Sequence, residues 1–243
     1  MSTEIKFQIP AGYERAIRFG ANWTMVISPY LILYFTLVII LEGGVSSGDL
    51  SAELSFAGSS PIAFKAIAIL DGLFHALFFI TSVTLFAILR SAYPVRASLI
   101  LVCGAWQMLM GYTKGLFSSY TFTNLGAAYL NADETLRAAL VSVATAADGL
   151  HSALQWMDSL GSMFVWVLVS LLPATVGLPR PVRWLGWILT IGILAPDPAF
   201  LLVILFSPAW LFMLGRWMKR LTLNSNPVLQ NTFLDQTQLS PGG

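Results

Sequence analysis

Two pairs of an aspartate and a histidine lie inside stretches of sequence that are otherwise apolar. Asp71 and His75 occur in DGLFHAL. Asp148 and His151 occur in DGLHSAL. Residues three or four positions apart share one face of an α-helix, so each pair would place a carboxylate beside an imidazole. Such pairs bind cations, metals or small polar molecules. The structural alternative is an imidazole that only hydrogen-bonds a carboxylate one turn away in the protein core.

Four more polar side chains continue this pattern. Gln155 and Asp158 follow the second pair at helical spacing, and Gln107 and Lys114 share one face of another apolar stretch. Turning an aspartate or a lysine toward lipid at mid-span costs about 2.5 to 3.5 kcal/mol. We therefore expect the polar faces to meet in a shared interior. Lys114 either pairs there with the aspartate of one of the two pairs or extends to the lipid headgroups.

Charge balance limits what this interior can contain. Away from the ends of the apolar stretches, Lys114 is the only cation against three aspartates, which are Asp71, Asp148 and Asp158. Balance requires protonated carboxyl groups, cationic histidines or a bound cation. The leading hypothesis is an intramembrane site for a cation, a metal or a small polar ligand. Its binding groups would be Asp71, His75, Asp148 and His151, with Gln107, Gln155 and Asp158 around them.

Two other functions stay open on the same residues. A zinc-like divalent metal has suitable imidazole and carboxylate ligands here, and a water bound to it would make the chain a metal-dependent membrane hydrolase. The ligands would be His75, His151, Asp71 and Asp148. Alternatively, one or both histidines would be axial ligands of a haem or a chlorophyll-type pigment. The chain would then be an accessory subunit of an energy-converting or electron-transfer complex, with other membrane subunits as partners.

The composition is typical of a membrane protein. Of the 243 residues, 56% are hydrophobic and 10% are charged, and the mean hydropathy is +0.74. About a quarter of the residues of a soluble domain are charged. We therefore predict an all-α integral membrane protein whose main partner is the lipid bilayer. The net charge of +1 offers no basic face for a nucleic acid, and the single cysteine, Cys103, excludes an internal disulfide and a thiolate metal cluster.

Six apolar stretches approach the ~20 residues that a helix needs to cross a bilayer. The fifth is the weakest, because it lies between Pro181 and the sequence Pro196-Asp197-Pro198 and reaches only ~22 Å. The sequence therefore predicts a bundle of six transmembrane helices. The predicted spans are residues 21–42, 62–90, 95–120, 138–172, 182–195 and 199–218.

The positions of the basic residues predict the topology. Ten of the 13 lysines and arginines lie before the first span, at or after the end of the sixth, or on either side of the second and fourth connecting loops. Lysine and arginine are enriched on the cytoplasmic side of membrane proteins, so both termini are expected to be cytoplasmic. The transmembrane domain would occupy residues 21–220, between a cytoplasmic segment of residues 1–20 and a polar tail of residues 221–243. We expect the Gly/Ser-rich stretch Gly43–Pro61 to be a flexible outer loop.

A weak internal repeat relates the two Asp/His pairs. DGLFHAL and DGLHSAL are each followed by an apolar run and then by PVR, at Pro94–Arg96 and Pro181–Arg183. This order predicts a parallel repeat of spans two to three and four to five about an axis along the membrane normal. The two pairs would then lie at similar depths in the membrane.

Three longer stretches resemble one family of membrane proteins. They are GLPRPVRWLGWILTIGIL (Gly177–Leu194), ADGLHSAL and TLFAILRSAYPVRASLIL. They look like elements of an uncharacterised bacterial polytopic membrane family, domain of unknown function 4386, and the likeness covers roughly residues 20 to 220. The resemblance implies a six-span bundle in the bacterial inner (plasma) membrane and carries no established activity.

Overall fold

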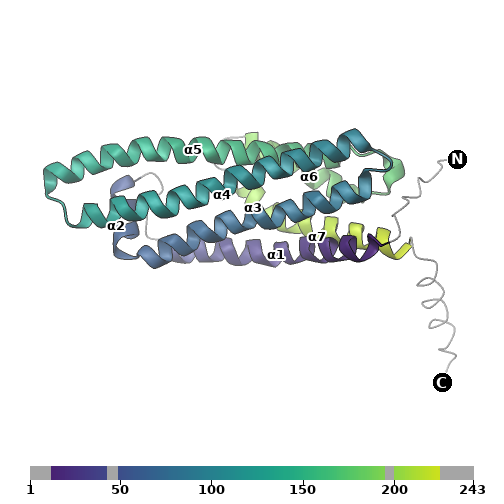
Figure 1. Ribbon diagram of the computed structural model, residues 1–243, viewed down its shortest axis with the longest axis horizontal. Coiled ribbons are helices and arrows are strands. Elements are labelled where there is room, and N and C mark those ends of the chain that lie inside the picture. The colour runs from purple at the N-terminus through teal and green to yellow at the C-terminus, as the bar shows by residue number, and fades with distance from the viewer. Residues whose placement is uncertain (1–11, 43–48, 195–199, 225–243) are drawn as a thin grey trace, which may run out of the picture. The chain divides into compact units, whose positions relative to one another are not determined.

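The computed structural model describes residues 12–42, 49–194 and 200–224, and Figure 1 shows its elements in chain order. Within these ranges the chain forms seven α-helices and one 3-10 helix and contains no strand, so the all-α prediction is confirmed for this part of the chain. The elements are α1 (Glu14–Glu42), α2 (Leu50–Ser59), α3 (Pro61–Leu89), α4 (Pro94–Leu130), α5 (Glu134–Ser170), η1 (Ala174–Val176), α6 (Arg180–Leu194) and α7 (Phe200–Asn224).

Among the helices of the described ranges, four are long and apolar enough to cross a membrane, namely α1, α3, α4 and α7. These four correspond to the first, second, third and sixth predicted spans. The helix α5 has 37 residues but carries four charged side chains, and α6 has only 15 residues. The chain therefore has the helices of a membrane protein, whereas the count of six crossings and the side on which the termini lie stay predictions.

The described residues form two compact units. The first unit comprises residues 12–28, 80–102, 165–194 and 200–224, and the second unit comprises residues 29–42, 49–79 and 103–164. In the first unit α6 packs against α7. Also within this unit, the hydroxyl groups of Thr24 and Thr81 are hydrogen-bonded at 2.9 Å. All eight candidate site residues lie in the second unit.

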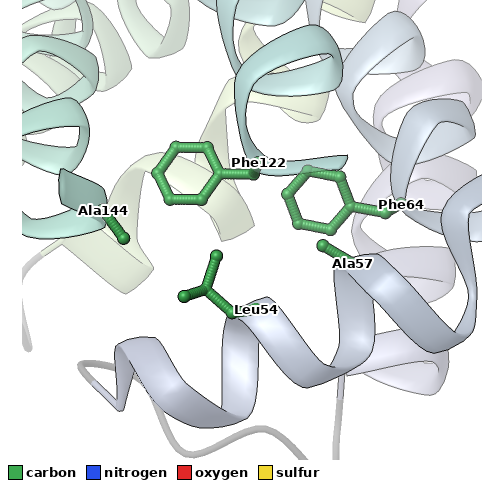
Figure 2. Close-up of a cluster of buried hydrophobic side chains, with 5 residues drawn as sticks. All are labelled: Leu54, Ala57, Phe64, Phe122 and Ala144. Carbon is green, nitrogen blue, oxygen red and sulfur yellow. The ribbon is translucent and has the colours of Figure 1, made fainter. Parts of the chain in front are cut away.

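The expectation of a flexible loop over Gly43–Pro61 is wrong for residues 50–59, which form α2. Asp49 caps this helix, because its carboxylate accepts hydrogen bonds from the backbone N–H groups of Ser51 and Ala52. The Gly/Ser content hid an apolar face that packs in the second unit, as Figure 2 shows. The buried cluster comprises Leu54, Ala57, Phe64, Phe122 and Ala144. Residues 43–48 lie outside the described residues.

Several helices extend beyond the ends of the predicted spans. α5 begins at Glu134, four residues before the predicted span, behind Asp133, whose carboxylate accepts a hydrogen bond from the backbone N–H of Leu136. The predicted spans were too short elsewhere, since α4 continues to Leu130 and α7 to Asn224, into the predicted tail. The Pro196-Asp197-Pro198 sequence and residues 1–11 and 225–243 lie outside the described residues.

Candidate functional site

A buried lysine joins two carboxylates from different helices of the second unit. The Nζ atom of Lys114, on α4, lies 2.9 Å from Oδ2 of Asp71, on α3, and 3.1 Å from Oδ2 of Asp158, on α5. Only 8% of the Lys114 side chain is exposed. Of the two positions expected for Lys114, the structure therefore shows the buried ion pair, with Asp71 as one partner.

His75 lies on the same two carboxylates. Its Nε2 atom is 3.5 Å from Oδ2 of Asp158 and 3.8 Å from Oδ1 of Asp71. Lysine and histidine thus alternate with two aspartates in a closed arrangement of four titratable groups. We refer to Asp71, His75, Lys114 and Asp158 as the charged cluster.

Gln107 contacts the other side of the His75 imidazole. The Nε2 atom of Gln107 lies 3.4 Å from Nδ1 of His75, and the glutamine is completely buried. Its Oε1 atom has no hydrogen-bond partner among the described residues. The two ends of an amide are assigned from hydrogen bonding rather than observed. Rotating this amide would let Oε1 accept a hydrogen bond from an N–H at Nδ1, so that both imidazole nitrogens would face acceptors.

A tyrosine that the sequence interpretation missed completes the surroundings of Asp71. The hydroxyl of Tyr34, on α1, donates a hydrogen bond to Oδ1 of Asp71 at 3.2 Å. One turn earlier, Tyr30 donates to the carbonyl of Leu70. Two tyrosines four residues apart in an apolar span are a signal that the sequence offered, because both hydroxyl groups need partners inside a membrane protein.

Three glycines let the helices approach closely enough to build the charged cluster. A Cβ atom on Gly111 would lie 2.2 Å from the Cδ2 and Cγ atoms of His75. One on Gly115 would lie 2.5 Å from the carbonyl oxygen of Ala68, and one on Gly161 would lie 2.9 Å from Cβ of Gln107. These glycines are therefore helix-packing positions, and Gly111 additionally makes the space that the imidazole fills.

The second Asp/His pair lies elsewhere on α5. Nδ1 of His151 is within hydrogen-bonding distance of the hydroxyl of Ser118, and the imidazole meets the Phe122 ring edge-on. Asp148 is half-buried and forms no ion pair with a described residue, and Gln155 is also half-buried. Of the eight candidate residues, five meet at one place. These are Asp71, His75, Gln107, Lys114 and Asp158.

The charged cluster consists of four groups that can each carry a proton. The position between the two carboxylates is filled by the Lys114 ammonium group, and the His75 Nε2 atom lies 3.5 Å from one of them and 3.8 Å from the other. Within the described ranges, no three His, Cys, Asp or Glu side chains are arranged to hold a metal ion.

Comparisons with models of protein families, with curated protein sequences and with solved structures found no match to this chain. The function is therefore inferred from the contacts and charges of the site alone.

Proposed function

We propose that this chain is an integral membrane protein that binds one exchangeable proton in its interior, on the imidazole of His75. The charge of the cluster supports this proposal. Asp71 and Asp158 are two carboxylates, whereas Lys114 supplies one ammonium group. A neutral His75 leaves one negative charge unbalanced, and a protonated His75 makes the cluster neutral.

Because the cluster is buried, its free energy differs strongly between a neutral and a protonated His75. An isolated ionised group away from water is so unfavourable that it usually changes its protonation state instead. His75 and Asp158 are almost completely buried, and the imidazole Nε2 faces both carboxylates of the cluster. A proton on His75 is therefore attracted by the two negative carboxylates and repelled by one positive group, the ammonium group of Lys114.

Groups from three other helices adjust the charge around His75. Tyr34 of α1 donates a hydrogen bond to Asp71. On α4, Gln107 lies beside Nδ1 of His75 and Lys114 pairs with both carboxylates, and α5 contributes Asp158. Release of the proton would leave the negative charge that a cationic or polar ligand needs, so that proton and ligand would compete for the same place. This refines the ligand-binding hypothesis drawn from the sequence.

The membrane setting completes the proposal. We infer that α5 and α6 join the four apolar helices as two further crossings, with both termini in the cytoplasm of a bacterial cell and the chain in its inner membrane. The distribution of basic residues supports this topology. The family resemblance, the parallel repeat, the haem- or pigment-contacting accessory subunit and the metal-dependent hydrolase stay predictions.

Infrared difference spectra test whether the proton is exchangeable. The chain contains two histidines, so His151→Gln leaves His75 as the only imidazole. We expect this variant, reconstituted in lipid and stepped reversibly from acid to alkaline pH, to show an imidazole deprotonation. The double variant His75→Gln/His151→Gln should lack it. A protonated-carboxyl band in place of the imidazole signal would show that the proton is bound to an aspartate. The assignment of the proton to His75 would then be wrong.

A further inference from the structure

A depression in the first unit combines basic and aromatic side chains. It has a volume of about 340 Å³ and is lined by Ser170, Arg183, Trp184 and Trp187. This volume is at the lower end of the range for small-molecule sites. The lining residues come from the end of α5 and the first turns of α6.

Two arginines from different helices bond the short segment that follows Ser170, one of the residues lining this depression. Nη1 of Arg96, on α4, donates to the carbonyl of Leu171 at 2.8 Å, and Nη2 of Arg183, on α6, donates to the carbonyl of Pro173 at 2.8 Å. These bonds hold both guanidinium groups at the C-terminal end of α5. A guanidinium group has five N–H donors, so most of the donors remain for another partner.

Among the described residues, no acidic side chain pairs with either of these two arginines. Residues 80–102 and 165–194 contain four arginines, which are Arg90, Arg96, Arg180 and Arg183, and neither Asp nor Glu. Arg96 and Arg183 form no ion pair with a described residue. A phosphate is the expected partner of such a pair, because a guanidinium group binds its oxygens with two parallel hydrogen bonds.

The exposed face of α6 shows what kind of phosphate fits. Trp184, Trp187, Ile191 and Leu194 are spaced three, four and three residues apart, and all four are exposed. Exposed Arg180 precedes Trp184 by one turn on the same face. The order of arginine, tryptophan and aliphatic residues matches the order of headgroup, interface and acyl chain in a bilayer.

We propose that this depression binds the headgroup of an anionic phospholipid. The phosphate would lie on Arg96 and Arg183, and the glycerol and upper acyl chain would contact Trp184 and Trp187. A free phosphate ion would use only the arginines. This site belongs to the first unit and involves no residue of the charged cluster.

Native mass spectrometry of the full chain, released from detergent with defined lipids, tests the proposal. We expect wild-type protein to retain one phosphatidylglycerol in preference to phosphatidylcholine. Since a basic residue near an anionic lipid surface contributes about fivefold in binding, Arg96→Gln and Arg183→Gln should each reduce the preference by about that factor. Arg216→Gln removes an exposed arginine of α7 and should leave the preference unchanged.

A second variant separates binding from folding. Arg183 also donates a hydrogen bond to the segment after α5, so its replacement can disturb the fold. Trp184 is 68% exposed, so Trp184→Ala should leave the fold intact. We expect Trp184→Ala to weaken phosphatidylglycerol retention. Equal retention of both lipids by wild-type protein would overturn the proposal. It would also be overturned if inorganic phosphate displaced the lipid and Trp184→Ala had no effect, since the ligand would then be a free anion.

Discussion

Replacing Lys114 by methionine is expected to lower the free energy of unfolding by about 3 to 5 kcal/mol, because breaking a buried ion pair leaves its partner charge uncompensated. Here one ammonium group serves two carboxylates, Asp71 and Asp158, at 2.9 and 3.1 Å. Without Lys114, the single positive charge of a protonated His75 cannot balance both carboxylates. Reversible unfolding in mixed micelles, followed by circular dichroism, measures the loss.

A matched control and a rescue make this result specific. Lys65→Met removes an exposed lysine from α3 and should change the free energy of unfolding by less than about 0.5 kcal/mol. Asp158→Asn added to Lys114→Met removes one of the stranded carboxylates and should recover much of the stability. If Lys114→Met were as stable as Lys65→Met, the ammonium group would not be paired inside the protein.

Gly111→Ala is expected to displace His75 and remove its pH-dependent infrared signal. The added Cβ would lie 2.2 Å from two ring carbons, a separation that requires the imidazole or the helix to move. Overpacking of a filled core typically costs about 1 to 3 kcal/mol. The change therefore tests whether the position of the imidazole, and not only its presence, allows the proton to bind.

Gly149 supplies the control for this substitution. It lies inside α5, and a Cβ there would meet nothing within 4 Å. Gly149→Ala should therefore leave the His75 signal intact and be neutral or stabilising by up to about 1 kcal/mol, the difference in helix propensity. An unchanged signal and unchanged stability in Gly111→Ala would show that His75 does not occupy the space beside α4.

The long apolar helices were predictable from hydropathy, whereas the short helix α2 was not. The apolar runs of α1, α3, α4 and α7 specify long helices because a bilayer offers no other way to satisfy the backbone. The helix α2 is stabilised by tertiary packing of Leu54 and Ala57 and by the Asp49 cap. Glycine and serine dominate the surrounding sequence, so its apolar spacing was outweighed by turn-forming composition.

The sequence indicated which residue types meet in the interior but not which aspartate joins them. Asp148 and Asp158 are ten residues apart on α5, which separates them by about 15 Å along the helix. Only one can therefore lie at the depth of Asp71, and helical spacing alone cannot select it. The choice depends on the offset between α3 and α5, which both approach α4 closely, α3 at Gly115 and α5 at Gly161.

Nitrogen-15 magnetic resonance of histidine tests the protonation of His75 most directly. In the His151→Gln background the labelled protein contains one imidazole, and its two ring nitrogens report whether each carries a proton. We expect both nitrogens of His75 to carry a proton in the unmodified cluster. One of them should lose its proton in Asp158→Asn, because Lys114 then balances the single remaining carboxylate, Asp71. A neutral imidazole in the unmodified cluster, unaffected by Asp158→Asn, would contradict a proton bound at His75.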